Sequence, residues 1–261
     1  MKILLFIPMY NCEKQIIRVL GQLDKQVIKF IDEVLIVNNR STDNGEKAVI
    51  EFAVQHPEIH LKLLRNENNY GGGGSHKVAF NYAVDNAYDY IIVLHGDDQG
   101  SINDIIPYIR SGEAYNYDAF LGARFLKKSK LINYSKFRIF GNYVFNAFMT
   151  LALGKRIYDL GAGLNMYSVD FLRSRFYMGF INSLTFYVYM LIYIVYSDAR
   201  FRFFPLTWRE DDQISNAKFF KQSMEIFRIT VGYLLRKEKV FDGRSSGDMR
   251  VDYKSEIIYE Q

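Results

Sequence analysis

Short apolar runs alternate with helix-like stretches over residues 1–125, and this alternation limits the fold more than any other feature of the sequence. The apolar runs predict strands at Ile3–Ile7, Glu33–Val37, Leu61–Leu64, Tyr90–Leu94 and Ala119–Leu121. Helical spacing between them predicts helices at Lys14–Leu23, Glu46–Val54, Lys77–Asn86 and Asp104–Ser111. Strands that alternate with helices form a mostly parallel sheet with helices on both faces. We therefore expect an α/β fold around a mostly parallel central sheet.

The rest of the chain predicts longer helical segments. We expect helices at Lys136–Leu153 and Phe219–Leu235, a long apolar helix within Phe176–Tyr196, and an edge-like strand at Arg202–Leu206. Asp159–Tyr167 is a glycine-broken loop in this interpretation. The segment after Phe241 is polar and rich in Gly and Ser, which predicts a loosely held tail over 241–261. The chain has no internal repeat and no clear linker, so we expect one domain over 1–240.

Composition excludes several classes of protein. Hydrophobic residues make up 49% of the chain and charged residues 24%, which is typical of a soluble globular protein and not of a disordered one. The net charge of +4 is too small to indicate a nucleic-acid partner. Cys12 is the single cysteine, and the N-terminus lacks the pattern of a signal peptide, so we expect a cytoplasmic protein. The apolar run within Phe176–Tyr196 is shorter than the ~20 residues of a membrane span, which favours a buried helix.

Polar clusters follow three of the predicted strands, at Pro8–Asn11, Asn38–Asp43 and His95–Gln99. In open parallel sheets, ligands bind beyond the carboxyl ends of the strands. We expect these clusters to converge on one cleft.

His95, Asp97 and Gln99 are candidate metal ligands. In an extended chain their i, i+2, i+4 spacing places all three side chains on one side. Imidazole, carboxylate and amide oxygen suit a divalent ion such as Mg²⁺ or Mn²⁺ that also holds phosphates. The alternative is a polar turn that caps the strand, with Asp98 facing solvent.

Other residues could bind an anion or a base. Gly71–Gly74 opens a predicted helix and could cradle a phosphate, or form a flexible turn. Lys77, on the first predicted turn, could meet an anion or a base, or remain solvated. The amides of Asn38 and Asn39 could pair with a nucleobase edge, although Asn is also common in turns.

Arg124 and Arg138 lie on either side of the basic loop Lys127–Lys130. Planar guanidinium groups bind phosphate well. The three lysines of the loop fit a solvated surface instead.

Seven segments, in one order from about Ile3 to Lys218, together resemble a known family. They are FIPMYNCEKQI, IVNNRSTDN, RNENNYGGGGSHKVAFNYAV, YIIVLHGDDQ, LGARF, DLGAGLNMYS and PLTWRED. The chain resembles family 2 glycosyltransferases with the GT-A fold, in particular the dolichyl-phosphate mannosyltransferase-like branch.

The resemblance implies inverting transfer of a sugar from a nucleotide sugar, foremost a UDP- or GDP-sugar. It assigns 1–125 to the donor half and 126–240 to the acceptor half, with Mg²⁺ or Mn²⁺ at His95, Asp97 and Gln99 and phosphate groups at Arg124 and Arg138. The implied donor-binding residues are Pro8, Tyr10, Asn11, Asn38, Asn39, Lys77, Gly96 and Asp97. Asp97 is also a candidate catalytic residue. Asp159, Glu210 and Asp211 are candidates for a general base, which a hydroxyl acceptor would need and a lipid phosphate would not.

The sequence departs from the family pattern at several positions. Asn38 and Asn39 replace two carboxylates, His95 replaces the first Asp of the metal motif, and Asn165 replaces an Arg. Glu210–Asp212 is acidic where many relatives are basic. A catalytically silent member that binds a nucleotide or a partner therefore stays the alternative. A nucleotidyltransferase is disfavoured because IPMYN is unlike the G-x-G-T-R-like loop of that class.

Lys136–Arg156 is aromatic on several faces and flanked by basic residues, as in helices that lie in a membrane interface. A core-facing helix pair is the alternative. The resemblance favours the interface, with a polyprenyl-phosphate or glycan acceptor, in cell-surface polysaccharide or lipid-linked sugar synthesis. We expect peripheral contact with the inner face of the cell membrane.

Overall fold

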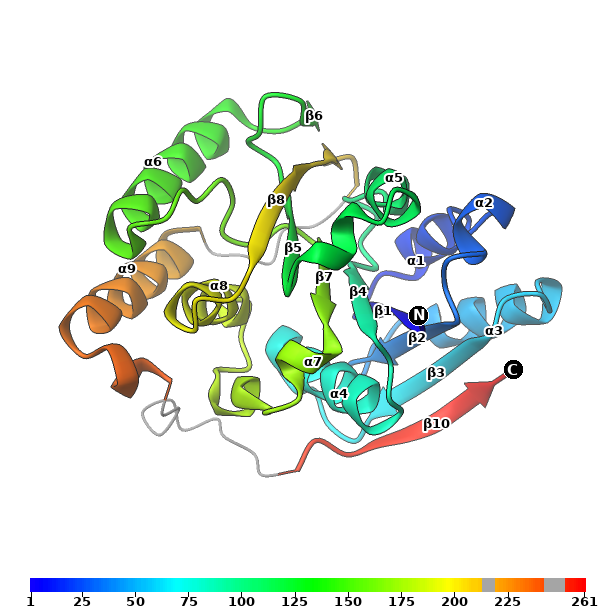
Figure 1. Ribbon diagram of the computed structural model, residues 1–261. Helices are drawn as coiled ribbons and strands as arrows, with labels where there is room; N and C mark the ends of the chain where they lie inside the picture. The colour runs from blue at the N-terminus through cyan, green and yellow to red at the C-terminus, as the bar shows by residue number, and fades with distance from the viewer. Residues whose placement is uncertain (213–218, 242–251) are drawn as a thin grey trace.

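The strand β1 (Ile3–Met9) lies in the middle of an eight-stranded sheet in the computed structural model, which describes residues 1–212, 219–241 and 252–261 (Figure 1). The strand order is β10 (Ser255–Glu260), β3 (Leu61–Asn66), β2 (Glu33–Asn38), β1, β4 (Tyr90–Leu94), β7 (Leu164–Ser168), β5 (Ala119–Ala123) and β8 (Phe201–Pro205). The pairs β1–β2, β1–β4, β2–β3 and β5–β8 are parallel, whereas β7 and β10 run antiparallel to their neighbours. The predicted α/β class with a mostly parallel sheet is confirmed.

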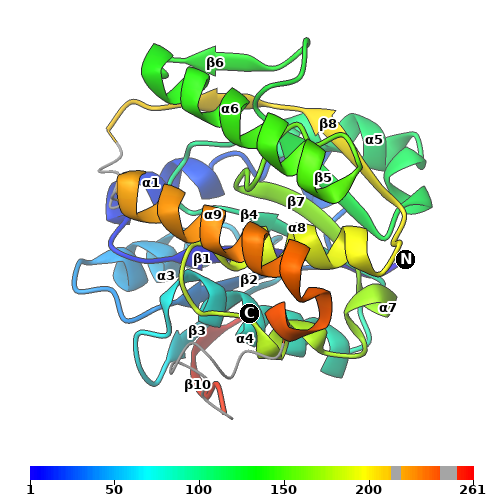
Figure 2. The same cartoon turned by 90° about the vertical axis from the view of Figure 1, so that its left-hand side faces the viewer.

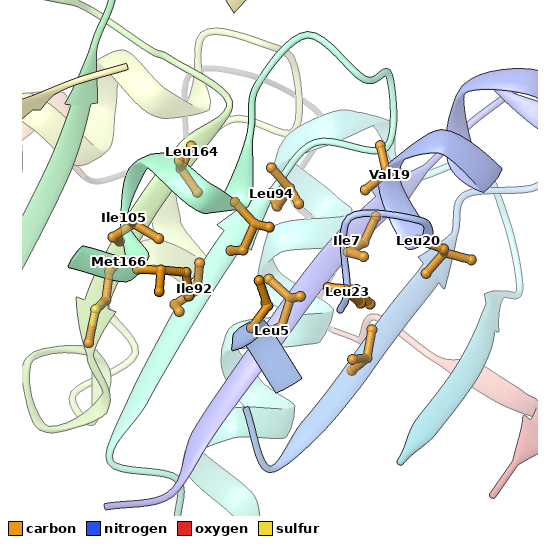
Figure 3. Packing of buried hydrophobic residues seen from close by; sticks show 14 of the residues in the cluster. Leu5, Ile7, Val19, Leu20, Leu23, Ile92, Leu94, Ile105, Leu164 and Met166 are labelled. Atoms are coloured by element: carbon orange, nitrogen blue, oxygen red, sulfur yellow. The ribbon is translucent and has the colours of Figure 1, made fainter. Parts of the chain in front are cut away.

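Helices cover both faces of this sheet. Successive residues of β1 point to opposite sides, so each face presents apolar side chains on which helices pack. Leu5 and Ile7 pack with α1 (Glu13–Leu20), α3 (Gly45–Gln55) and α5 (Ile106–Arg110), as Figure 3 shows in part. Leu4 and Phe6 pack in the opposite core with α4 (Gly71–Asp85) and α8 (Phe186–Tyr196). The other elements are α2 (Lys25–Ile28), α6 (Lys136–Leu153), α7 (Val169–Leu172), α9 (Phe219–Leu235) and a two-stranded sheet of β6 (Lys130–Ile132) and β9 (Thr207–Arg209).

The expected loop Asp159–Tyr167 is wrong in its second half, which forms the buried strand β7 between β4 and β5. Its residues Leu164, Asn165, Met166 and Tyr167 are all buried. A strand covered on both faces has no polar–apolar alternation for sequence analysis to detect.

The expected long apolar helix within Phe176–Tyr196 is also interrupted. Phe176–Gly179 forms a 3₁₀ turn, and the continuous helix α8 begins only at Phe186. The intervening residues turn to contact the start of α4. Within the described ranges, none of the helices combines the length and apolarity needed to cross a membrane.

The expectation of a loosely held tail is wrong for its last residues. Ser255–Glu260 forms β10 and pairs with β3, where Lys62 Nζ lies 2.9 Å from a Glu260 carboxylate oxygen and Arg65 lies 3.1 Å from Glu256 (Figure 1). Without this strand, β3 would present a row of unpaired backbone groups at the edge of the sheet. Residues 242–251 of the predicted tail lie outside the described residues.

The glycine run lies inside α4, which begins at Gly71 and not near Lys77. Gly73 N–H donates to Asn182 O at 2.8 Å, and a Cβ at Gly73 would come within 2.6 Å of Ile181 O. The run therefore lets a helix end approach another backbone closely, which is one use of glycine. This contact replaces the phosphate cradle and the flexible turn that we considered.

We expect Gly73→Ala to destabilise the protein by about 1–3 kcal/mol, because the new methyl group has no space in this contact. Gly72→Ala is the matched control, since its Cβ would meet only Leu184 Cδ2 at an ordinary 3.4 Å and alanine favours a helix. Urea unfolding of both variants measures the difference. Equal stability of the two variants would contradict this account of the glycine run.

Candidate active site

The three polar clusters meet at the carboxyl ends of β1, β2 and β4, as expected. Gly96 N–H donates to Pro8 O at 3.2 Å, and Asn39 N–H donates to Met9 O at 2.9 Å. Asn11 Oδ1 accepts from the Thr42 backbone N–H at 2.8 Å. Tyr10 is 45% exposed beside this junction. The convergence follows from the parallel sheet, because the carboxyl ends of its strands share one edge.

His95 and Asp97 lie together at the end of β4, but the chain between them turns instead of staying extended. His95 Nδ1 is 4.0 Å from Asp97 Oδ2, and Asp97 Oδ1 accepts from the Gln99 backbone N–H at 3.2 Å. Asp98 has φ of +60°. Its carboxylate is buried against Arg18 Nε at 2.6 Å, so it does not face solvent as the alternative reading required.

The donor set at this turn fits a divalent cation only in part. Among the described residues, no group of three His, Cys, Asp or Glu side chains converges as a metal site. The imidazole and carboxylate of His95 and Asp97 are nevertheless suitable ligands, and Mg²⁺ or Mn²⁺ often takes its remaining ligands from substrate phosphates and water. The pair therefore fits a cation that is completed by a bound nucleotide.

A small loop and a buried helix fix the His95 ring. His95 N–H donates to Gly163 O at 2.9 Å, and a Cβ at Gly163 would come within 2.8 Å of His95 Cγ. On the other side, His95 Nε2 is hydrogen-bonded to the Tyr187 hydroxyl, which also bonds His76 Nε2 at 2.6 Å. Burial lowers the pKa of His95; Asp97 offsets part of this shift and Arg124 adds to it. The ring is therefore held neutral and in one orientation.

Asn38 and Asn39 are buried, and both amides bind other protein groups. Asn38 Nδ2 donates to Glu46 at 2.6 Å, and Glu46 also pairs with Arg65. Asn39 Oδ1 accepts from the Tyr70 backbone N–H at 2.8 Å, and Asn39 Nδ2 donates to an Asn69 amide oxygen at 2.8 Å. These amides connect the end of β2 to α3 and to the segment before α4, and direct contact with a donor base stays a prediction.

Lys77 is fully buried, so it is not solvated as one reading supposed. Its Nζ donates to Phe180 O, to Asn182 Oδ1 at 2.9 Å and to the Tyr253 hydroxyl at 2.9 Å. The ammonium thus joins α4, the segment before α8 and the C-terminal segment. Because Lys77 is fully buried, a nucleotide sugar cannot reach its ammonium group in this conformation. The structure therefore gives no support for its predicted donor-binding role.

Arg124 and Asp159, predicted for phosphate binding and for general base catalysis, bind each other. Arg124 Nε and Nη2 donate to the two Asp159 oxygens at 2.8 and 2.7 Å, and the Arg124 backbone N–H donates at 2.8 Å. Burial alone would lower the pKa of Arg124, but the charge and hydrogen bonds of Asp159 outweigh it and raise that pKa above its usual value. Trp208 lies under the guanidinium at 5.1 Å.

The acidic run Glu210–Asp212 binds three different elements. Glu210 pairs with Arg138 of α6, Asp211 accepts from Asn133 Nδ2 at 2.7 Å, and Asp212 accepts from Arg18 of α1 at 2.8 Å. Arg138 therefore has an acidic partner at the position where the sequence predicted a phosphate. The run therefore connects α1 with α6 and the segment before it.

Comparison with known proteins gives the family. The model of glycosyl transferase family 2 matches residues 5–176, about two thirds of the chain. This chain belongs to glycosyltransferase family 2. The resemblance seen in the sequence is confirmed, including the lipid-phosphate branch, because curated relatives of this glycosyltransferase include undecaprenyl-phosphate sugar transferases.

The curated relatives each match about two thirds of this chain. An uncharacterised protein of Methanocaldococcus jannaschii is 32% identical over 171 residues, 64% of this chain and 72% of that protein. An undecaprenyl-phosphate mannosyltransferase of Micrococcus luteus is 24% identical over 67% of this chain and 69% of its own length. An undecaprenyl-phosphate 4-deoxy-4-formamido-L-arabinose transferase of Photorhabdus laumondii is 28% identical over 64% of this chain, but only 49% of its own length is covered.

Solved structures confirm the GT-A fold of this glycosyltransferase. Glucosyl-3-phosphoglycerate synthase of Mycobacterium tuberculosis, crystallised with UDP, has a TM-score of 0.60 at 13% identity and matches 89% of this chain and 79% of its own. TarS of S. aureus has a TM-score of 0.59 at 19% identity over 90% of this chain and 40% of its own.

Sequence reasoning missed two residues beside the cleft, His76 and Tyr187. Tyr187 lies inside an apolar run, where nothing in the pattern separates it from a core aromatic residue. His76 lies next to Lys77, which has the more familiar signal of a basic side chain after a glycine run. Only the packing of α8 against α4 brings the two together.

We expect Asp159→Asn to destabilise the glycosyltransferase by about 3–5 kcal/mol, because it leaves the buried Arg124 without a counter-charge. Glu51→Gln is the control, since the Lys47–Glu51 pair is exposed and such pairs contribute about 0–1 kcal/mol. Urea unfolding at pH 7 measures the free energy of unfolding of both variants. A small, equal effect of the two substitutions would refute a structural role for the Arg124–Asp159 pair.

Proposed function

We propose that this chain is an inverting, divalent-cation-dependent glycosyltransferase that transfers a sugar from a UDP- or GDP-sugar to a lipid phosphate at a membrane surface. In this reaction the bond between the sugar C1 and the donor phosphate oxygen breaks, and a bond from C1 to the acceptor phosphate oxygen forms on the opposite face. The nucleoside diphosphate leaves. The acceptor is already ionised, so no proton has to be removed from it.

The observation that carries this proposal is the pairing of the candidate bases. Asp159 accepts three hydrogen bonds from Arg124, Glu210 pairs with Arg138, and Asp211 accepts from Asn133. A general base needs an oxygen within reach of the acceptor proton. An acceptor without such a proton fits this arrangement better than a sugar hydroxyl does. Two relatives are named as undecaprenyl-phosphate sugar transferases, which agrees with it.

The donor side would use the turn after β4. His95 and Asp97 would hold Mg²⁺ or Mn²⁺, which supplies positive charge to the leaving diphosphate when bound. One structural neighbour, glucosyl-3-phosphoglycerate synthase of Mycobacterium tuberculosis, was crystallised with Mn²⁺ and UDP in two complexes. Asp97 is in this view a cation ligand and not a base. Arg138 would orient the acceptor phosphate once Glu210 is displaced, since guanidinium binds both groups in the same geometry.

The helices α6 and α9 lie side by side (Figure 2), and their exposed apolar side chains form a surface that a lipid could approach. The two helices contact each other, and Phe148 stacks on Phe227 with ring centroids 5.5 Å apart. Their exposed residues include Phe137, Phe140, Tyr143, Val144, Leu151, Phe227, Leu234 and Leu235.

Basic residues border this apolar surface. Lys136 lies at the start of α6, Lys155 and Arg156 follow its end, and Arg228 and Arg236 lie in and after α9; all five are exposed. An anionic bilayer matches both features, because apolar side chains enter the interface and basic ones meet the head groups.

Turnover with defined substrates tests the reaction. We expect Mn²⁺-dependent release of UDP or GDP and a glycosyl lipid with polyprenyl phosphate, and no transfer to the matching polyprenol. Asp97→Asn should lower turnover by on the order of 100-fold or more, since a cation contributes several kcal/mol to the transition state. Asp170→Asn, at an exposed carboxylate of α7, is the control.

The other outcomes are equally informative. Equal transfer to polyprenol would refute the phosphate acceptor and return attention to a general base. No turnover with any donor, together with nucleotide binding, would support the catalytically silent alternative that the departures at Asn38, Asn39 and His95 suggest.

Membrane contact is tested separately by sedimentation with vesicles. We expect the protein to pellet with vesicles that contain anionic lipid, and Phe137→Ser with Phe140→Ser to weaken this binding at least tenfold, because each exposed Phe contributes about 1.5–3 kcal/mol when buried. Val54→Ser is the control, an exposed apolar residue of α3 that lies outside the surface. Unchanged binding of the double variant would rule out this surface as the membrane contact.

A further inference from the structure

Two buried side chains link the His95 ring to the start of α4. His76 Nδ1 is 2.7 Å from Gly72 O, His76 Nε2 is 2.6 Å from the Tyr187 hydroxyl, and that hydroxyl is hydrogen-bonded to His95 Nε2. Both His76 and Tyr187 are buried, whereas the His95 side chain is 21% exposed. The chain of hydrogen bonds therefore has one end at a backbone carbonyl and the other beside Asp97.

The Gly72 carbonyl determines which atom donates in each of these three hydrogen bonds. A carbonyl oxygen only accepts, so the proton between Gly72 and His76 is on Nδ1 of His76. His76 is only 1% exposed, and such burial disfavours a charged ring, so the ring is neutral and its Nε2 accepts from the Tyr187 hydroxyl. The single proton of the Tyr187 hydroxyl then points to His76. The Tyr187 oxygen can only accept from its other neighbour.

The hydrogen bond between Tyr187 and His95 determines which ring nitrogen of His95 carries the proton. Because the Tyr187 oxygen accepts, His95 Nε2 carries the proton and Nδ1 carries the lone pair. Nδ1 is the atom that lies 4.0 Å from Asp97 Oδ2. Gly163 and Tyr187 hold the ring from two sides, so it cannot turn to exchange the two nitrogens without losing the bond to Tyr187.

We propose that His76 and Tyr187 are positioning residues that hold His95 as its Nε2–H tautomer and so aim the Nδ1 lone pair beside Asp97 at a divalent cation, with Mn²⁺ preferred over Mg²⁺. The part concerning the cation rests on the proposed function. Nitrogen donors bind Mn²⁺ and later transition metals better than Mg²⁺, which prefers oxygen. Groups that orient a ligating imidazole in this way contribute about 10–100-fold to metal affinity.

The tautomer is measured without metal, donor or turnover. Two-bond ¹H–¹⁵N correlation spectra of the full-length protein labelled at histidine separate the two nitrogens of each ring, and His95→Gln assigns the His95 signals. We expect a protonated Nε2 and an unprotonated Nδ1 at His95. A protonated Nδ1 with an unprotonated Nε2 overturns the proposal, whether or not the protein transfers a sugar.

The second measurement removes the Tyr187 hydroxyl. We expect Tyr187→Phe to raise the dissociation constant for Mn²⁺, followed by the electron paramagnetic resonance of free Mn²⁺, by about 10–100-fold. Tyr189→Phe, two residues further along α8, should leave it unchanged. Mg²⁺ should displace Mn²⁺ from the wild type only in large excess, and in Tyr187→Phe at a smaller excess.

Each contrary result overturns one part of the proposal. Equal Mn²⁺ affinity of Tyr187→Phe and the wild type, or an equal loss in Tyr189→Phe, overturns the positioning role. An Nε2–H tautomer at His95 without Mn²⁺ binding retains the hydrogen-bond chain and overturns its use for a cation. Circular dichroism and the melting temperature of each variant separate these effects from unfolding.

Discussion

The close contact between the start of α4 and the segment before α8 determines most of the site. Gly73 allows two backbones to meet there, with its N–H on Asn182 O. The same approach brings Lys77 to Asn182 and Tyr253, and brings His76 to Tyr187. One helix end thus connects the N-terminal part of the sheet, the segment before α8 and the C-terminal segment. A larger side chain at Gly73 would push these segments apart, because a Cβ there would come within 2.6 Å of Ile181 O.

The two arginines of the candidate site are each paired with a carboxylate, which changes how the site can select a ligand. Arg124 has Asp159 and Arg138 has Glu210. A buried pair holds its geometry but gives up little of its charge to a third group. The half-exposed Arg138 is therefore the more accessible of the two for an anion that can displace a carboxylate. The amides of Asn38 and Asn39 add hydrogen bonds without adding charge.

Sequence reasoning predicted what depends on local pattern and missed what depends on packing. The strands β1 to β5 follow apolar runs, so their order and the convergence of their ends were predictable. β7 was missed because it is buried on both faces, and β10 because a polar tail gives no sign of a distant partner strand. The proximity of His95 and Asp97 was predicted, although from an extended chain that in fact turns. The Arg124–Asp159 pair and the Tyr187 bridge join residues far apart in the sequence, where no periodicity applies.

The position of β10 has a consequence for how the chain is made. Its partner β3 ends at Asn66, and roughly 190 further residues precede Ser255. At about 5–20 residues per second, the ribosome leaves that edge of the sheet uncovered for on the order of 10–40 s. During this interval Lys62 places positive charge along β3, which discourages pairing with strands of other chains, whereas Arg65 already has Glu46 as its partner. Glu260 of β10 later pairs with Lys62, so a residue that protects the nascent edge also binds the strand that finally covers it.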